Sequence, residues 1–190
     1  MKLNTGYIIS GVAFVFLALI FFTPLSDFFV SKINDATLTG PSVELPDRQF
    51  SLNDDDLGID LKGYNGTMDA NLADFKGQVV FLNFWGSWCP PCVAEMPSIQ
   101  QLYESKGKEV AFVLMTMQDK PEKFVPYLQE NQYTMPVYEA ESLLPKKIIP
   151  NVFPTTYIIN KRGEVVFRET KTKDWNQAEV HQILERLIKE

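Results

Sequence analysis

Cysteine and histidine are scarce in this chain. Its 190 residues contain two cysteines, Cys89 and Cys92, and one histidine, His181. A structural zinc site needs about four ligands, so this shortage argues against a zinc-binding fold. A purely structural disulfide is also disfavoured, because closing a loop between residues so near in sequence stabilises a protein little. Composition alone does not exclude that the two cysteines are unreactive thiols in the core.

Concentrated positive charge is also lacking. The net charge is −6 and no basic patch stands out, so we do not expect the protein to bind nucleic acid. The acidic run Asn53-Asp54-Asp55-Asp56 lacks the Asp-x-Asp-x-Asp-Gly spacing of a calcium loop. We therefore expect a solvated loop there and no metal site.

The N-terminal segment lacks charge altogether. Residues 3–26 contain no charged side chain, and such a length can cover a hydrocarbon core of about 30 Å. Lys2 precedes the segment, so the positive-inside rule places everything after it outside the cytoplasm. A small-x-small cleavage site and a lipid-accepting cysteine are both missing, which favours an uncleaved anchor over a cleaved signal peptide. The sequence therefore predicts a transmembrane signal anchor (1–26), a tether (27–40) and one exported domain (41–190).

The two cysteines lie in the motif Trp88-Cys89-Pro90-Pro91-Cys92. The apolar run 79–85 before it predicts a buried parallel strand, and residues 93–103 after it predict an amphipathic helix with Val93, Met96, Ile99 and Tyr103 on one face. The motif would then begin a helix, where unpaired N–H groups and the helix dipole stabilise a thiolate. This placement predicts a lowered pKa and a nucleophilic role for Cys89, and redox chemistry for the pair.

The rest of the pattern predicts an α/β fold with mixed strand directions. Further strands are expected at residues 59–61, 67–70, 110–115, 135–138, 155–159 and 164–168, with hairpin turns at 63–66 and 160–163. Further helical segments are expected at residues 71–75, 121–131 and 178–188. Pro126 falls inside one of them and should kink it.

The segment Phe81–Pro97, which contains the cysteine motif, resembles the membrane-anchored thiol–disulfide oxidoreductases of the TlpA/ResA type. The likeness runs from about Pro41 to the C-terminus and is also specific at Phe153-Pro154-Thr155-Thr156. It implies a thioredoxin fold with an N-terminal β-hairpin extension and a central helix–strand insertion at residues 121–138. It implies a redox-active Cys89–Cys92 disulfide and no cofactor.

The resemblance also assigns roles to single residues. Cys89 would be the exposed, attacking thiol and Cys92 the resolving thiol. Pro154 would follow a cis peptide bond and lie against the disulfide. The remaining residues expected at the substrate-binding surface are Trp88, Pro90, Pro91 and Phe153.

Glu95, three residues after Cys92, matches an acidic residue that this family keeps near its thiols. A partly buried carboxylate there would raise the thiol pKa or relay the proton of Cys92. An ordinary acid in the early turns of a helix is the alternative. Asn83 occupies the position of a buried aspartate in thioredoxin, and its neutral amide cannot accept a proton.

The resemblance implies disulfide exchange with exported proteins, in the direction of reduction, for example of apocytochrome c before haem attachment. It also implies a membrane thiol as electron donor and a single-pass location in the cell membrane, with the domain on the extracytoplasmic side. Two alternatives are a thiol peroxidase and a Sco-like copper carrier. The first needs a threonine where Gly86 stands, and the second needs wider cysteine spacing and a histidine in a loop, whereas His181 lies in a predicted helix.

Overall fold

The computed structural model describes residues 50–190. The predicted anchor (1–26), the tether (27–40) and the start of the domain lie outside this range, so the expectations about them stay predictions. Within residues 50–190, no helix is both long and apolar enough to cross a membrane.

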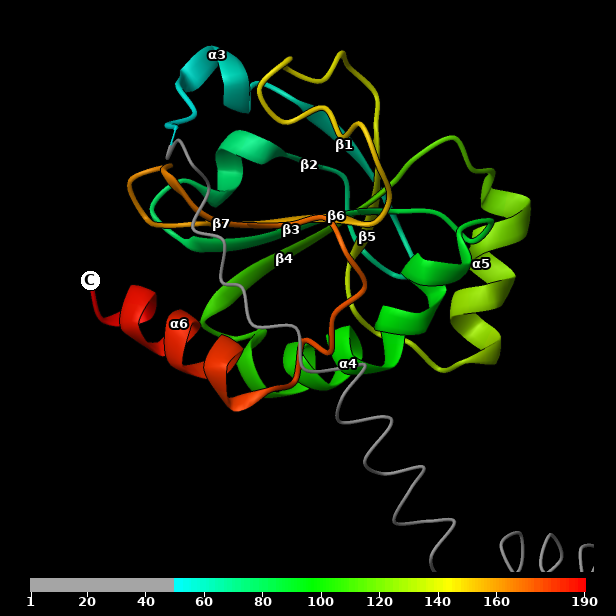
Figure 1. The fold of residues 1–190 in the computed structure, drawn as a ribbon. Coiled ribbons are helices and arrows are strands. Elements are labelled where there is room, and N and C mark those ends of the chain that lie inside the picture. The colour runs from blue at the N-terminus through cyan, green and yellow to red at the C-terminus, as the bar shows by residue number, and fades with distance from the viewer. Residues whose placement is uncertain (1–49) are drawn as a thin grey trace, which may run out of the picture. The chain divides into compact units, whose positions relative to one another are not determined.

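Within residues 50–190, seven strands form one mixed sheet in the order β2-β1-β5-β4-β3-β6-β7 (Figure 1). Strands β3, β4 and β5 are parallel to one another, whereas β1 and β6 run antiparallel to both of their neighbours. The strands are β1 (Asp60–Tyr64), β2 (Ala70–Asn71), β3 (Val79–Trp85), β4 (Val110–Thr116), β5 (Val137–Ala140), β6 (Thr155–Ile159) and β7 (Val165–Glu169). The expected α/β fold with mixed strand directions is confirmed.

Helices cover both faces of this sheet. They are α3 (Asp54–Leu57), the 3₁₀ helix η1 (Leu72–Phe75), α4 (Pro90–Lys106), α5 (Pro121–Glu130) and α6 (Ala178–Lys189). Figure 1 shows α4 and α6 on the same side of the sheet and α3 on the opposite side. Helix α6 buries Val180, Leu184 and Leu187, as its helical spacing predicts.

Strand β3 supplies side chains to both layers of the core. All seven of its residues are buried, as expected of a central strand covered on both faces. Phe81 and Trp85 pack in the same apolar cluster as residues of α4, α5 and α6. Val80, Leu82 and Phe84 pack in a second cluster on the other face. Because successive side chains of a strand alternate between faces, Asn83 lies on the α4 side with Phe81 and Trp85.

Helix α4 begins at the motif, as predicted, and continues to Lys106, beyond the predicted amphipathic stretch 93–103. Cys89 is the N-cap, and Pro90 and Pro91 occupy the first turn, where their missing N–H groups leave no bond unmade. The buried face is also different from the expected one. Val93 and Tyr103 are only half-buried, and the fully buried positions of the helix are Cys92, Glu95, Met96, Ile99, Gln100 and Leu102.

The expected N-terminal hairpin is present, but its second strand is shorter. The turn has Asn65 and Gly66 at positive φ, and the Thr67 N–H donates to the Tyr64 carbonyl at 3.1 Å. Strand pairing resumes only at Ala70, and the strand expected at 67–70 is wrong for its first three residues. The reason is that the Asp69 carboxylate accepts the Gly63 N–H at 3.0 Å, in place of a strand carbonyl.

Two other segments differ from expectation. The acidic run expected as a loop is the one-turn helix α3, because Asn53 and Asp56 form a capping box. Strand β5 begins two residues later than expected. The N–H groups of Thr134 and Met135 donate to the side-chain oxygen of Gln100 on α4, so they are not available to a strand.

The predicted insertion corresponds to α5 and β5, and β5 pairs between β4 and β1. Pro126 does lie inside α5.

Candidate redox site

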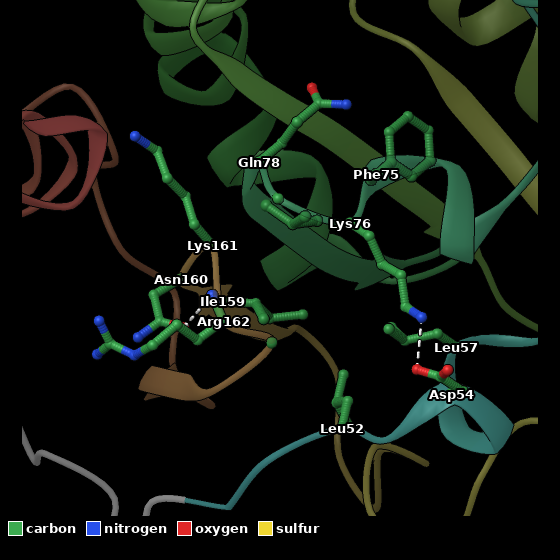
Figure 2. Close-up of a pocket in the computed structure, with 13 residues that line it drawn as sticks. Leu52, Asp54, Leu57, Phe75, Lys76, Gln78, Ile159, Asn160, Lys161 and Arg162 are labelled. Atoms are coloured by element: carbon green, nitrogen blue, oxygen red, sulfur yellow. Dashed lines mark hydrogen bonds and ion pairs between the residues drawn. The ribbon is translucent and has the colours of Figure 1, made fainter. Parts of the chain in front are cut away.

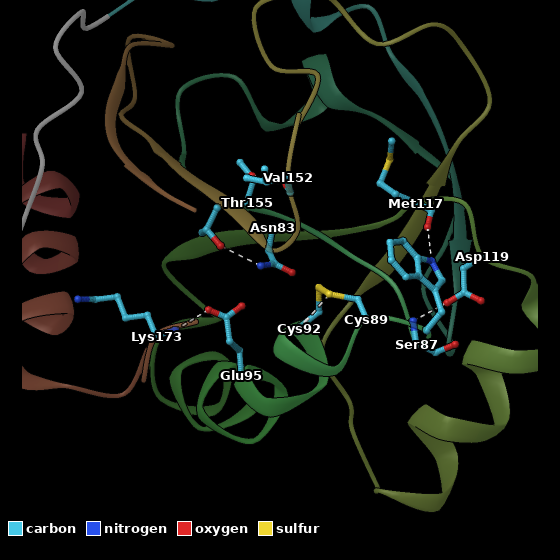
Figure 3. The surroundings of a disulfide bond; sticks show 12 residues. Asn83, Ser87, Cys89, Cys92, Glu95, Met117, Asp119, Val152, Thr155 and Lys173 are labelled. Atoms are coloured by element: carbon cyan, nitrogen blue, oxygen red, sulfur yellow. Dashed lines mark hydrogen bonds between the residues drawn. A yellow bond between two sulfur atoms is a disulfide. The ribbon is translucent and has the colours of Figure 1, made fainter. Parts of the chain in front are cut away.

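The two cysteines form a disulfide at the end of β3 and the start of α4 (Figure 3). Their Cα atoms lie 5.3 Å apart. Strand β3 ends at Trp85, and a short loop, 86–88, leads to Cys89 at the N-cap of α4. The buried strand therefore delivers the motif to the helix N-terminus, as predicted.

The N-terminal backbone of α4 points at the first sulfur. The Cys92 N–H donates to Cys89 Sγ at 3.3 Å. A donor in this position and the helix dipole both favour negative charge on that sulfur. In the reduced protein this geometry favours the thiolate of Cys89, which is the form that attacks disulfides.

Both cysteines are buried in this disulfide form. Cys89 is 4% exposed and Cys92 is 1% exposed, so the expectation of an exposed Cys89 is wrong here. The reason is that Cys89 bonds through its sulfur to the fully buried Cys92, and both belong to the same apolar cluster as Trp85 and Met96. In the disulfide form, the two cysteines therefore differ little in exposure.

The loop before Cys89 is held by the segment that follows β4. The Trp88 indole N–H donates to the Met117 carbonyl at 2.9 Å, and the Ser87 N–H donates to Asp119 Oδ2 (Figure 3). Sequence reasoning did not identify Met117 or Asp119, and no local pattern marks them. Parallel pairing of β3 with β4 brings the ends of both strands to one edge of the sheet and so places these residues beside the motif.

An aromatic surface adjoins the disulfide. Trp88 is 46% exposed, and its ring meets the half-buried Phe153 edge-on, with centroids 5.5 Å apart. The Phe153–Pro154 peptide bond is cis, as expected from the resemblance, and Pro154 is buried. Pro90 and Pro91 are exposed at the start of α4. Three residues of the predicted substrate-binding set are therefore exposed next to the cysteines: Trp88, Pro90 and Pro91.

Glu95 is more deeply buried than expected, at 1% exposure. Two donors converge on Oε1: the backbone N–H of Lys173 at 2.8 Å and the indole N–H of Trp175 at 3.0 Å. Oε2 has no hydrogen-bond partner among the described residues. Burial raises the pKa of Glu95 to about 8, although the two donors act to lower it. Glu95 is therefore an acid that holds its proton into the neutral range.

Asn83 faces the same region from β3. It is fully buried, and its Nδ2 donates to Thr156 Oγ1 at 2.8 Å. Within residues 50–190 its Oδ1 has no partner. Figure 3 shows the side chains of Asn83, from β3, and Glu95, from α4, on the Cys92 side of the disulfide. Glu95 is thus a buried ionisable side chain on the Cys92 side of the disulfide.

The structure bears on both alternative functions. A Cβ atom on Gly86 would lie 2.9 Å from Cε2 of Trp88, so the threonine that a peroxidase needs at this position would displace the Trp88 indole. His181 lies in α6 and its Nε2 is 2.8 Å from Asn176 Oδ1. In the described part of the chain, no three His, Cys, Asp or Glu side chains gather into a metal-binding group. Absence of a cofactor itself stays a prediction.

A separate pocket of about 210 Å³ lies at the opposite end of β3 (Figure 2). Its lining residues include Val80 at the start of β3, Leu57 of α3 and Arg162 of the β6–β7 turn. Because the cysteines follow the other end of β3, this pocket is not part of the redox site.

Comparison with known proteins gives concordant results. The Redoxin family model matches residues 46–185. The thiol-disulfide oxidoreductase ResA of Geobacillus kaustophilus is 32% identical over 169 residues, which cover 87% of this chain and 88% of that protein. ResA of Geobacillus thermodenitrificans is 30% identical over 167 residues, covering 86% and 87% of the two chains.

Solved structures show the same fold at lower identity. A putative thiol:disulfide interchange protein DsbE from Chlorobium tepidum superimposes with a TM-score of 0.58 at 22% identity, covering 74% of this chain and 94% of that one. StoA from Bacillus subtilis gives a TM-score of 0.54 at 24% identity, covering 77% and 99%. Both similarities support the thioredoxin-like α/β fold.

Proposed function

The chain belongs to the redoxin family and is a thioredoxin-like thiol–disulfide oxidoreductase, and from this premise we propose that it reduces disulfides in exported proteins, with Cys89 as the attacking thiol and Cys92 as the resolving thiol. The observation that carries the assignment is the hydrogen bond from the Cys92 N–H to Cys89 Sγ at the N-terminus of α4. A thiolate on Cys89 gains that donor and the helix dipole, whereas Cys92 lies inside the first turn of the helix.

The reaction proceeds in two exchanges. The Cys89 thiolate attacks one sulfur of the substrate disulfide, forming a mixed disulfide and releasing the other substrate sulfur as a thiolate. The Cys92 thiol then loses its proton and attacks Cys89 Sγ, which forms the Cys89–Cys92 disulfide and releases the second substrate thiolate. Two electrons pass to the substrate. The disulfide form described here is the product, and a dithiol donor must reduce it before the next cycle.

Glu95 is the group that we assign to the proton of Cys92. Residues three apart on a helix are neighbours, and Glu95 lies one turn after Cys92 on the buried side of α4. A carboxyl group with a pKa near neutrality both accepts and returns a proton at physiological pH. Asn83, the other polar side chain at this face, has no proton to exchange.

Trp88 and Phe153 form the surface that we assign to substrate contact. Their rings present aromatic area next to Cys89, and aromatic side chains contribute strongly to protein interfaces. The neighbouring Val152 is 49% exposed and extends this apolar edge.

The sequence supports the proposed location of the reaction and the proposed partners. The uncharged segment 3–26 after Lys2 supports a single membrane anchor with the domain on the extracytoplasmic side. Its substrates would be exported proteins, with apocytochrome c as an example, and a membrane thiol protein would supply electrons. The resemblance to TlpA/ResA-type proteins supports this direction of electron flow.

A trapping experiment tests the proposal. Cys92→Ser in the full-length chain removes the resolving thiol, so mixed disulfides between Cys89 and its substrates should accumulate in cells and disappear on reduction. Cys89→Ser is the matched control and should trap few partners. Equal trapping by both variants would overturn the assignment of roles, and partners confined to the cytoplasm would overturn the location.

Protease treatment of spheroplasts provides a second test. The domain should be digested from outside and should fractionate with membranes. Recovery in the soluble cytoplasmic fraction would contradict the anchor.

A further inference from the structure

The loop between β7 and α6 is attached to one turn of the active-site helix. The Lys173 N–H and the Trp175 indole N–H donate to Glu95 Oε1, at 2.8 and 3.0 Å. One turn along the helix, the Trp175 backbone N–H donates to Ser98 Oγ at 3.0 Å. The Ser98 hydroxyl in turn donates to the Glu95 carbonyl at 2.8 Å. A loop 78 to 80 residues away in sequence therefore determines how the Glu95 carboxyl group is oriented.

Both donors act on the same oxygen. In a neutral carboxyl group the carbonyl oxygen is a better acceptor than the hydroxyl oxygen, so Oε1 takes the carbonyl role. The proton then sits on Oε2, which has no hydrogen-bond partner within residues 50–190. Figure 3 shows one carboxyl oxygen of Glu95 directed at the Lys173 backbone and the other directed toward the side of Asn83 and Cys92.

We propose that Trp175 is a positioning residue. Together with the Lys173 N–H, it keeps Oε1 of Glu95 as the oxygen that accepts hydrogen bonds. Oε2, on the disulfide side, is then the atom that gains and loses the catalytic proton. The inference deepens the proposed function and rests on it for the use of that proton. Trp175 itself touches no reacting atom and acts through Glu95.

The indole is suited to this role because it is fixed. Trp175 is fully buried and packs edge-on against Phe81 of β3, with ring centroids 5.0 Å apart. It packs similarly against Phe167 of β7 at 6.1 Å. These rings restrict the indole to one orientation, so its N–H is directed at Glu95 without a further loss of side-chain entropy.

The charged groups around Glu95 do not replace this contact. On β7, the carboxylate of Glu169 raises the Glu95 pKa. The Lys173 ammonium lies 3.9 Å from Glu179 of α6, so its charge is directed toward that helix. From β3 the neutral amide of Asn83 faces the site, and on α4 the sulfurs of Cys89 and Cys92 are joined in a disulfide. The two N–H donors are therefore the groups that favour the ionised carboxylate.

The test measures the Glu95 pKa in the oxidised full-length protein, where the cysteines do not titrate. Glutamate labelled with ¹³C at Cδ reports the titration by NMR, and the Glu95 signal is identified by its loss in Glu95→Gln. Trp175→Phe keeps an aromatic ring and removes the donor. Because a hydrogen bond to a carboxylate favours its charged form, the Glu95 pKa should rise by roughly one pH unit.

Infrared spectroscopy gives a readout that packing alone would not change. A hydrogen bond to a carbonyl oxygen weakens the C=O bond. The C=O stretching band of protonated Glu95 should therefore move to higher frequency in Trp175→Phe.

Trp85→Phe is the matched control. Trp85 is as fully buried as Trp175 and packs edge-on against Phe124, but its indole N–H has no partner in the described part of the chain. The control loses the same ring area and no hydrogen bond, so the Glu95 pKa and infrared band should stay as in the wild type. An unchanged pKa in Trp175→Phe, or an equal shift in Trp85→Phe, would overturn the proposal.

If Trp175→Phe does not fold, 3-benzothienylalanine at position 175 keeps the shape of tryptophan and lacks the N–H. The same shift is expected with it, and an unshifted pKa would count equally against the proposal.

The failure of this inference is distinguishable from failure of the proposed function. The pH profile of disulfide reduction should move to higher pH in Trp175→Phe, in parallel with the Glu95 pKa. If Glu95→Gln leaves that profile unchanged, the catalytic role of Glu95 is wrong, while the NMR titration of the oxidised protein still decides the role of Trp175.

Discussion

The indole ring of Trp88 meets the phenyl ring of Phe153 edge-on, with centroids 5.5 Å apart, although 65 residues separate them in the sequence. One ring comes from the loop before α4 and the other from the segment before β6. Gly86 makes this arrangement feasible, because any Cβ there would overlap the Trp88 indole. The pair gives the surface beside Cys89 an aromatic face of defined orientation.

Removal of this face should impair protein substrates more than small ones. We expect Trp88→Ala to lower kcat/KM for a protein disulfide by about tenfold, because an exposed aromatic anchor is lost from the interface. The rate with a small disulfide such as cystine should change little. Met68→Ala is the control, since Met68 is 86% exposed in the hairpin connection between β1 and the edge strand β2. An equal loss with both substrates would show that Trp88 acts on the thiols and not on substrate contact.

The two thiols of the reduced protein should differ in reactivity. Cys89 should be alkylated first by limiting iodoacetamide and should have a pKa below the ordinary value of about 8.5, because its sulfur accepts the Cys92 N–H at the N-terminus of α4. Mass mapping of the modified peptides at several pH values measures both properties. Preferential modification of Cys92 would contradict the assignment of the attacking thiol.

Glu95→Gln should change the titration of the thiols. Burial raises the pKa of Glu95 to about 8, and a negative charge on Glu95 disfavours a second negative charge on the neighbouring Cys92. Glutamine keeps the shape and removes one of the two charges, so thiolate formation should shift to lower pH by about one unit. Thiolate absorbance against pH, measured beside the reduction rate of a model disulfide, tests this. Superimposable curves for the two proteins would show that the charge of Glu95 does not affect the thiols.

The stability of the oxidised protein should fall as the pH rises through the neutral range. Burial raises the Glu95 pKa from 4.5 to about 8, so between these values the folded state binds more protons than the unfolded chain. The stabilisation from this group is complete below about pH 4.5 and is lost progressively up to about pH 8, at no more than about 1.4 kcal/mol per pH unit. Thermal melts across this range should show the decline.

Glu95→Gln should flatten that decline, because glutamine has no proton to lose. Glu130→Gln, at an exposed position at the end of α5, is the matched control and should keep the slope of the wild type. Equal slopes of stability against pH in the wild type and in Glu95→Gln would show that Glu95 does not cause the decline.

Local patterns led to wrong boundaries where side chains bind backbone groups. The strand expected at 67–70 is replaced by a loop whose Asp69 carboxylate accepts the Gly63 N–H. The strand expected from Met135 starts later because Gln100 accepts the N–H groups before it. In both cases a polar side chain competes with the sheet for the same donor, and hydrophobic periodicity carries no information about that competition.

The sequence by itself determined the elements around the cysteines. A continuous apolar run makes β3 a buried strand, and prolines after Cys89 suit the first turn of a helix, so both elements depend on residues close together in the chain. Only the tertiary structure decided the environment of Glu95. Its partners Lys173 and Trp175 come from the other end of the domain, and the burial that raises its pKa exists only when that loop packs on α4. Desolvation and long-range hydrogen bonds depend on distance in space, which the order of residues along α4 does not contain.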